Sequence, residues 1–327
     1  MTDRPAVSVI LAVLDEADHI DDVMADLLGQ DYVGPLEVVV ADGGSGDGTL
    51  ELLEEWQRRD PRLRVVHNPE RRQGPGLNLA AAEASGSVLV RADGHTRYAP
   101  DYVSASVRAL GELGGAVGGR INPEASTRFG RAVAAAMRSP LTMGPGKFHH
   151  ADARTEADTT YLGAFRKDNF HAVGGYRSFP SGTSEDADLY FRWRRSGRRV
   201  FIDPTIRSTY TPRQRPGELW RQYWRYGQGK AEMLWANGQF PSWRPLAPLA
   251  LVLGVAALVV LGVASGVWWP LGLVLAAWVL LLLGVGVASG VSPPAVAAAA
   301  GIMHLAYGLG LLYGLVRGPG PVRRLRE

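Results

Sequence analysis

In the first third of the chain, short apolar runs alternate with segments whose apolar positions recur at helical spacing. The runs are typical of buried strands, and the segments between them are typical of amphipathic helices. Strands are predicted at residues 7–13, 36–41, 63–67 and 88–92, and helices at residues 15–29, 49–59, 76–84 and 100–113. Strands and helices that alternate at this spacing predict an α/β fold with a mostly parallel sheet and flanking helices.

Three long apolar runs dominate the end of the chain, at residues 246–269, 271–289 and 295–316. Each has roughly the 20 residues that a helix needs to cross a bilayer. Between Leu246 and Val316 the only ionisable side chains are His304 and two tyrosines, whereas helices of a soluble core would show a polar face. We therefore predict an α/β domain at residues 1–240, C-terminal transmembrane helices in a membrane domain at residues 241–316, and a basic tail at residues 317–327.

The flanking charges do not fix how many of these runs cross the membrane. Arg244 precedes the apolar block, and a cluster of arginines follows it, at Arg317, Arg323, Arg324 and Arg326. Cytoplasmic segments are enriched in basic residues, so two cytoplasmic ends would require an even number of crossings. Either one run is re-entrant or interfacial, or the charge rule fails here. The N-terminus lacks the pattern of a signal peptide, so we expect the α/β domain to be cytoplasmic.

Composition narrows the chemistry. The chain has no cysteine, which excludes disulfides and thiolate metal sites, so any metal must be held by oxygen or imidazole nitrogen. The formal net charge is +3. A balance this mildly basic does not indicate a nucleic-acid partner, and none is expected.

Polar residues follow each predicted strand, at residues 15–16, 42–48, 67–76 and 93–95. Because ligands of parallel α/β sheets bind at the carboxyl ends of the strands, these loops are expected to share one binding edge. The glycine-rich loop at residues 42–48 lacks the lysine of a P-loop and, unlike a dinucleotide-binding loop, follows the second strand. Its leading Asp42 can accept a hydrogen bond from a nucleotide base, whereas Asp47 is predicted to cap the next helix.

Asp93 and His95 stand two residues apart at the end of the fourth predicted strand. On an extended or turning backbone, both side chains can face one direction. A carboxylate and an imidazole are a reasonable partial ligand set for Mn²⁺ or Mg²⁺, with Mn²⁺ favoured by the imidazole. We predict a divalent metal site here, completed by phosphate oxygens and water.

Two later segments carry candidate chemistry. Glu185 and Asp186 lie in the first turn of a predicted helix that Thr183 or Ser184 would cap. Acids there also stabilise the helix dipole, so the residues alone do not decide between a structural and a catalytic role.

Gln222 and Arg225 share one face of a further predicted helix, where the planar guanidinium of Arg225 can meet a diphosphate. The aromatic residues around them also suit a helix that lies on a membrane surface. One helix can serve both purposes on its different faces.

Five segments between about residues 5 and 238 stand in a characteristic order. They read VSVILAVLDEADHI, VVVADGGSGDGT, RADGH, SEDADLYFRWRRSG and RQYWRYGQGK. Together they resemble the motifs of family 2 glycosyltransferases with the GT-A fold. Asp15 and Gly43 depart from the first two motifs, Arg91 replaces the first acid of the Asp-x-Asp metal motif, and Tyr226 replaces the tryptophan of the Gln-x-x-Arg-Trp motif. Within the family, the chain is most similar to bacterial membrane-anchored exopolysaccharide enzymes of the succinoglycan type.

The resemblance implies a nucleotide-diphospho-sugar donor, by default a UDP-sugar, and a divalent cation, Mn²⁺ or Mg²⁺. It implies a catalytic base at Asp186 and metal ligands at Asp93 and His95. It implies donor contacts from Glu16, Asp42, Arg91, Asp93, Gln222 and Arg225. Acceptor contacts are expected from Glu185 and from a long polar loop at residues 142–167, which includes His149 and His150.

Arg91 leaves three readings open, because a cation there departs from the family pattern. It could weaken the metal site, contact a phosphate directly, or point into the sheet and pair elsewhere. His95 could replace the lost ligand.

The combined expectation is an inverting hexosyltransferase that acts on a lipid-linked polyprenyl glycan in cell-surface polysaccharide biosynthesis. It would be a multi-pass protein of the plasma membrane with a cytoplasmic catalytic domain, and other polysaccharide-assembly proteins are a further class of partner. Two alternatives stay open. One is a polyprenyl-phosphate sugar synthase, whose acceptor is the lipid phosphate itself. The other is an inactive nucleotide-binding component of an export complex.

Overall fold

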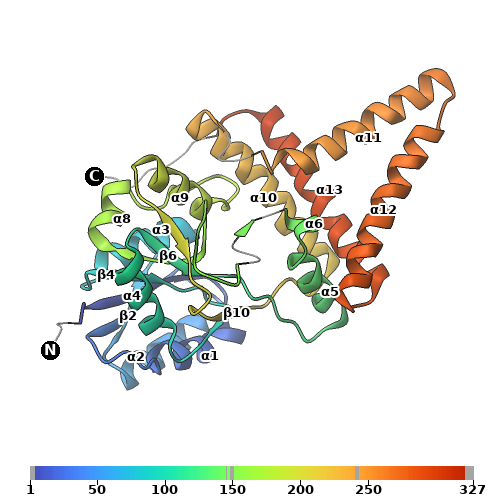
Figure 1. The fold of residues 1–327 in the computed structure, drawn as a ribbon. Helices are drawn as coiled ribbons and strands as arrows, with labels where there is room; N and C mark the ends of the chain where they lie inside the picture. Colours follow the sequence, from blue (N-terminus) through green and yellow to red (C-terminus); the bar gives the residue numbers. More distant parts are fainter. Residues whose placement is uncertain (1–3, 145, 148–150, 240–242, 321–327) are drawn as a thin grey trace.

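The computed structural model describes residues 4–144, 146–147, 151–239 and 243–320. Within these residues a central eight-stranded sheet forms an α/β domain, and long helices extend from one side of it (Figure 1). The strand order is β3-β2-β1-β4-β8-β6-β9-β7. The strands are β1 Val7–Val13, β2 Leu36–Asp42, β3 Leu63–His67, β4 Val88–Arg91, β6 Ala116–Gly119, β7 Thr155–Glu156, β8 Tyr161–Arg166 and β9 Val200–Ile202.

The first four strands of the sheet are parallel, as predicted. β1 pairs with β2 and β4, and β2 pairs with β3, all in parallel register. β8 then runs antiparallel between β4 and β6, and β9 is parallel to β6. A separate two-stranded sheet pairs β5 (Thr96–Tyr98) with β10 (Ser208–Tyr210). The predicted α/β fold with a mostly parallel sheet is confirmed.

Each face of the sheet has its own helical layer. Val9 and Leu11 of β1 belong to a core with α1, α2 and α4, whereas Ile10 belongs to a core with α3, α8 and α9. This alternation follows from side chains that point to opposite faces along a strand. The helices are α1 Ala17–Leu28, α2 Thr49–Arg59, α3 Gln73–Glu83, α4 Tyr102–Leu113, α8 Lys167–Val173 and α9 Glu185–Arg195.

The first helix begins later than predicted, because the side chain of Asp15 is hydrogen-bonded to the glycine-rich loop instead of capping the helix. α1 starts at Ala17 with Glu16 as its N-cap, and Asp15 has a left-handed φ of 55°. Asp15 Oδ1 accepts a hydrogen bond of 2.9 Å from the N–H of Gly46. The helices predicted at residues 76–84 and 100–113 also shift, the former starting three residues earlier and the latter two residues later.

Two predicted helix caps are wrong in detail. Gly48 is the N-cap of α2, although Asp47 Oδ1 still accepts a hydrogen bond of 3.1 Å from the N–H of Thr49. Ser184 is the N-cap of α9, but with a φ of 71° its side chain makes no capping hydrogen bond. The hydroxyl of Thr183 donates to a backbone oxygen of another helix instead. The first turn of α9 therefore lacks a side-chain cap.

The expectation of a long loop at residues 142–167 is wrong for its second half. β7 lies there, and β8 is inserted between β4 and β6 in the middle of the sheet. The apolar run of β8 is too short to stand out from the polar residues on both sides. His149 and His150 lie outside the described residues.

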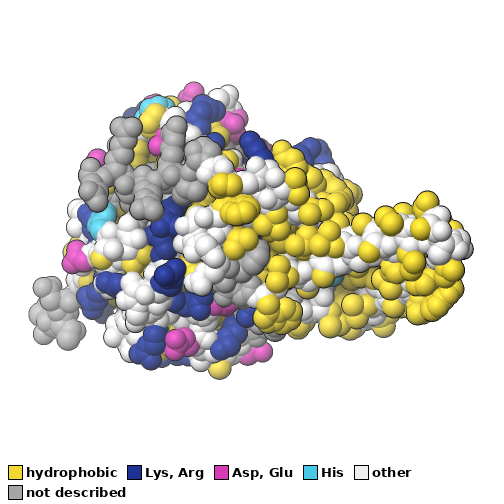
Figure 2. Space-filling model, turned by 90° about the horizontal axis from the view of Figure 1, so that it is seen from above, with side chains coloured by type: hydrophobic (Ala, Val, Ile, Leu, Met, Phe, Trp, Pro, Cys, Tyr) yellow, Lys and Arg dark blue, Asp and Glu magenta, His cyan; other side chains and the backbone are white. Residues whose placement is uncertain are grey.

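Three long apolar helices end the chain: α11 Leu246–Ser265, α12 Trp269–Ser289 and α13 Pro293–Arg317. By length and composition each could cross a membrane, with mean hydropathies of 2.7, 2.6 and 1.7. α11 ends before its predicted run does, because Gly266 in a left-handed conformation ends the helix at Ser265, whereas α12 ends at Ser289 as predicted, followed by the left-handed Gly290. α11 and α12 project from the rest of the molecule and present a largely apolar surface (Figure 1, Figure 2).

α13 packs along α10 (Pro216–Asn237) instead of projecting (Figure 1). Glycines allow the close approach: a Cβ at Gly310 would lie 2.2 Å from the Trp224 oxygen, and one at Gly227 would lie 2.2 Å from a backbone oxygen of α13. On another face of α10, a Cβ at Gly229 would lie 2.3 Å from Thr183 Oγ1. α10 therefore contacts both a candidate membrane helix and the loop that precedes α9.

Replacing Gly310 with leucine should separate α13 from α10, because the added side chain meets backbone that cannot rotate away. Overpacking of this kind costs about 1–3 kcal/mol. Gly254→Leu in α11 is the matched control, since a Cβ at Gly254 has nothing within 4 Å. Thermal unfolding of both variants in detergent measures the difference. Equal melting temperatures would show that the crossing is not close in solution.

Candidate active site

The loops after β1, β3 and β4 meet at one edge of the sheet, as the parallel strands require. The N–H of Glu16 donates to Thr49 Oγ1 over 2.8 Å, which ties the loop after β1 to the start of α2. Gln73 Nε2 donates to Asp93 Oδ1 over 3.2 Å, which joins the loops after β3 and β4. His95 Nδ1 lies 3.0 Å from Glu16 Oε1, which joins the loops after β4 and β1. The prediction of a shared edge is confirmed.

Asp42 closes the glycine-rich loop onto itself. Its Oδ2 accepts hydrogen bonds from the N–H groups of Gly44 and Ser45, at 2.7 and 3.1 Å. Its Oδ1 accepts from the Ser45 hydroxyl over 2.5 Å, and the residue is 1% exposed. These bonds shape the loop, while a contact of Asp42 with a nucleotide base stays a prediction.

Arg91 and Asp93 form a buried ion pair at the end of β4. Arg91 Nε donates to Asp93 Oδ1 over 3.1 Å, and the guanidinium lies over the ring of Tyr176 at 5.5 Å from its centre. Burial opposes the positive charge, but the nearby charges of Asp93 and Asp186 help to raise the pKa of Arg91 well above its ordinary value. Arg91 thus pairs with Asp93, the predicted metal ligand itself, while a weaker metal site and a contact of Arg91 with a phosphate stay predictions.

Glu16 orients His95. Burial lowers the pKa of His95, but the hydrogen bond and the charge of Glu16 outweigh burial and raise that pKa above its ordinary value. Metal-binding histidines commonly donate one ring N–H to a carboxylate, which leaves the other nitrogen free for the metal. With Nδ1 bonded to Glu16, Nε2 of His95 is the nitrogen available for a ligand.

This chemistry fits a divalent cation, although the chain supplies few ligands. Among the described residues, no three His, Asp or Glu side chains lie close enough together to hold a metal. Asp93 and His95 would therefore be two protein ligands, and the remaining positions would fall to phosphate oxygens and water. Glu16 is bonded to His95 in this arrangement, and its predicted contact with the donor stays a prediction.

Glu185 and Asp186 lie in the first turn of α9. A Cβ at Gly74 would lie 3.2 Å from Glu185 Cγ, so the glycine lets the first turn of α9 approach α3. Glu185 is 6% exposed, and its Oε1 has no hydrogen-bond partner in the described part of the chain. Burial raises the pKa of Glu185 to about 7. Asp186 is half-buried, and its charge acts on both Arg91 and Lys230.

The Glu185→Gln variant should be more stable than the parent protein at pH 8. The unfolded carboxyl loses its proton near its ordinary pKa, whereas the folded one keeps it until about pH 7. The contribution of Glu185 to the free energy of unfolding is thus largest at acidic pH and falls as the pH rises to about 7. The loss is on the order of 3 kcal/mol, and glutamine avoids it. Melting temperatures from pH 4 to 8 test this, and a difference that does not grow with pH would contradict it.

Gln222 and Arg225, the two motif residues of α10, make contacts in different parts of the structure. Gln222 Nε2 donates to the hydroxyl of Tyr210 over 3.2 Å, and the Tyr210 ring lies 6.0 Å from the ring of His95. Arg225 Nε donates to the Ser181 oxygen over 2.9 Å, so it holds the loop before α9. The structure thus brings Gln222 near the predicted metal ligands, while a contact of Arg225 with a diphosphate stays a prediction.

Two cations that were not predicted lie beside the site. Lys230 of α10 is half-buried and makes no ion pair within the described residues, and burial lowers its pKa against the opposing charge of Asp186. Arg213 follows β10, and its charge acts on His95. A lysine four residues after Tyr226, on a face that is otherwise aromatic, is the sequence signal that could have identified Lys230.

Comparisons with known proteins agree with this geometry. The family model described as "Glycosyl transferase family 2" matches residues 8–172. Over 314 residues the chain is 32% identical to the succinoglycan biosynthesis protein ExoA of Rhizobium meliloti, with 92% of each chain covered.

A second relative is the dolichyl N-acetyl-alpha-D-glucosaminyl phosphate 3-beta-D-2,3-diacetamido-2,3-dideoxy-beta-D-glucuronosyltransferase of Methanococcus voltae. It is 21% identical over 237 residues, which cover 70% of this chain and 74% of the relative. Among solved structures, the mannosyltransferase PcManGT of Pyrobaculum calidifontis, in complex with GDP-Man and Mn²⁺, matches with a TM-score of 0.64. The two are 25% identical over 92% of this chain and 88% of that chain, which confirms the GT-A fold. The chain belongs to glycosyl transferase family 2.

Proposed function

We propose that the protein is a membrane-anchored inverting glycosyltransferase of exopolysaccharide biosynthesis. It takes a sugar from a nucleotide-diphospho-sugar, by default a UDP-sugar, and transfers it to a lipid-linked glycan at the cytoplasmic face of the plasma membrane. The biosynthetic role of the R. meliloti relative and the GDP-Man and Mn²⁺ in the archaeal mannosyltransferase support this proposal.

The chemistry rests on the residues around Arg91. Asp186 accepts the proton of the attacking acceptor hydroxyl, and a single carboxylate on that side suffices for one displacement with inversion. The charges of Asp93 and Asp186 both act on Arg91, so its guanidinium interacts with both the proposed metal ligand and the proposed base. A divalent cation held by Asp93 and His95 would supply positive charge to the leaving diphosphate. Gln222 and the cationic Lys230 and Arg213 add polar contacts beside it.

The proposal of a lipid-linked acceptor is supported by one observation, the position of α10. Gly227 of α10 contacts α13, which could cross a membrane, and Gly229 contacts the loop before Asp186. In this proposal the base lies close to the membrane, where the sugar of a lipid-linked acceptor lies. Tethering of this kind raises the effective concentration of enzyme and acceptor. The M. voltae relative is itself named for a dolichyl-linked sugar acceptor.

A donor screen tests the proposal. The purified full chain in detergent is heated with UDP-, GDP- and dTDP-sugars, each with and without Mn²⁺. One sugar nucleotide is expected to raise the melting temperature in a Mn²⁺-dependent way, because a ligand that binds only the folded state stabilises it. Analysis of the lipid product then distinguishes a glycosidic bond from a phosphodiester, which would instead indicate a polyprenyl-phosphate sugar synthase. No stabilisation and no transfer with any donor would contradict an enzymatic role.

A further inference from the structure

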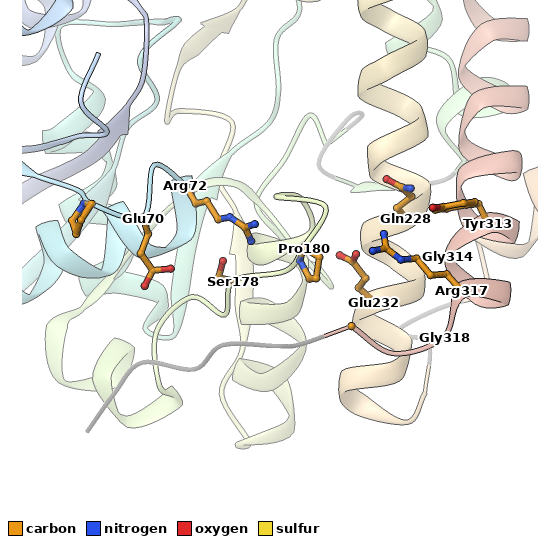
Figure 3. Close-up of a pocket in the computed structure, with 12 residues that line it drawn as sticks. Glu70, Arg72, Ser178, Pro180, Gln228, Glu232, Tyr313, Gly314, Arg317 and Gly318 are labelled. Carbon is orange, nitrogen blue, oxygen red and sulfur yellow. The ribbon is translucent and has the colours of Figure 1, made fainter. Parts of the chain in front are cut away.

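A cavity of about 490 Å³ lies where the α/β domain meets the end of α13 (Figure 3). Arg72, just before α3, and Ser178, in the loop before α9, lie on one side of it. Glu232 of α10 and Arg317 of α13 lie on the other side. An occupant would therefore contact both the catalytic domain and the pair of helices that leads to the membrane.

The cavity holds one buried donor without an acceptor and two exposed arginines. Ser178 is 4% exposed, and its hydroxyl has no hydrogen-bond partner among the described residues. A buried hydroxyl without a partner is costly, so its position indicates a ligand or water in the cavity. Arg72 uses one N–H for the Phe179 oxygen, at 3.0 Å, and its other donors remain. Arg317 forms no ion pair within the described part of the chain.

The acidic side chains of the cavity are already engaged. Glu232 Oε2 accepts hydrogen bonds from the N–H and the hydroxyl of Ser181, at 3.1 and 2.6 Å. Glu70, which also lines the cavity, takes part in an interaction of its own. Two arginines and one hydroxyl are thus left to recognise an anion. Arginine binds phosphate with its planar fork of N–H donors.

The position of the cavity indicates where that phosphate comes from. Arg317 is the last residue of α13, and Tyr313, one turn earlier, is 45% exposed and also lines the cavity. Basic and aromatic side chains at the end of an apolar helix are typical of the membrane–water interface. A Cβ at Gly308 of α13 would lie 2.4 Å from the Pro248 oxygen, so the last turns of α13 lie beside the start of α11. If α11 enters the bilayer there, the cavity lies near the depth of the lipid phosphates. Its size suits a phosphate or diphosphate group with its neighbouring atoms.

We propose that this cavity binds the phosphate of a membrane lipid, with Arg72, Arg317 and Ser178 as its donors. The inference rests on the membrane location in the proposed function, but not on the transfer reaction. The bound phosphate braces the loop at residues 178–184, which Arg72 and Glu232 contact at Phe179 and Ser181. Because that loop leads directly into the first turn of α9, lipid binding favours the observed position of Asp186.

Native mass spectrometry of the delipidated full chain in detergent tests the site. The probes are phosphatidylglycerol, a polyprenyl phosphate and, as the phosphate-free comparison, diacylglycerol. One phosphate lipid per chain is expected, and Arg317→Gln and Arg72→Gln should each weaken it about 10-fold or more through loss of a charged hydrogen bond. Arg317→Lys should weaken it less. Arg215→Gln is the matched control, since Arg215 is 83% exposed and lies outside the cavity.

The two phosphate lipids distinguish the sources. Tighter binding of polyprenyl phosphate assigns the site to the acceptor lipid, and tighter binding of phosphatidylglycerol assigns it to the surrounding bilayer. Binding of diacylglycerol as tight as either phosphate lipid, or binding that both arginine variants leave unchanged, would overturn the proposal. The donor-induced rise in melting temperature is measured on Arg317→Gln and should persist. Its loss in all samples, including the parent protein, would count against the proposed transferase and not against this site.

Discussion

Asp186→Asn is expected to abolish sugar transfer and to leave donor binding intact. Asparagine has nearly the same shape but cannot take a proton from the acceptor hydroxyl. General-base catalysis typically contributes ~10²–10⁴-fold to the rate, so kcat should fall by that factor. Donor binding should persist, because the predicted donor contacts at Asp93 and His95 come from the loop after β4, not from α9. The measurements are single-turnover transfer and the donor-induced shift in melting temperature.

Two control variants make this result specific. Asp168→Asn changes an exposed acid in the first turn of α8 and should leave the rate unchanged, which excludes a general effect of first-turn charge. Glu185→Gln changes the adjacent buried carboxyl and should alter the KM for the acceptor more than kcat. A pKa of about 7 would also suit a general base, so Glu185 is the competing candidate. An active Asp186→Asn enzyme together with an inactive Glu185→Gln enzyme would assign the base to Glu185.

The sheet edge where the loops after β1, β3 and β4 meet could be predicted from local pattern alone. β1 and β2 are apolar over nearly their whole length because parallel strands at the centre of a sheet are buried on both faces. Parallel strands place their carboxyl ends together, so the meeting of Glu16, Asp93 and His95 followed without tertiary information. The three apolar helices could also be predicted from the sequence, because a helix that crosses a bilayer needs mainly sufficient length and hydrophobicity.

The second half of the α/β domain depends on long-range contacts that local pattern does not contain. β7 and β9 are two and three residues long, which is too short for any periodicity to show. β8 pairs with β4, so Leu89 and Phe165 are register partners although they lie far apart in the sequence. The approach of α10 to α13 depends on Gly227 and Gly310, two among many glycines of the chain. The ion pair of Arg91 with Asp93 was not among the readings of Arg91 that the sequence offered.

Asp93→Asn is expected to remove the Mn²⁺-dependent part of donor binding, because it takes away the charged one of the two predicted protein ligands. Hydrogen-bonding partners of metal ligands already affect metal affinity by about 10–100-fold, so a ligand itself should matter at least as much. The variant also breaks the buried pair and leaves the Arg91 cation without its carboxylate. Breaking a buried pair costs about 3–5 kcal/mol, so loss of binding alone could reflect a damaged fold.

The double variant Arg91→Met with Asp93→Asn separates these two effects. Methionine removes the uncompensated cation and fills similar space beside Tyr176, so the double variant should regain most of the melting temperature that Asp93→Asn loses. It should not regain the Mn²⁺-dependent response to the sugar nucleotide. Recovery of stability without recovery of the metal response would assign Asp93 to the donor site. A full Mn²⁺ response in either variant would show that the cation is held elsewhere, and that the end of β4 serves the fold alone.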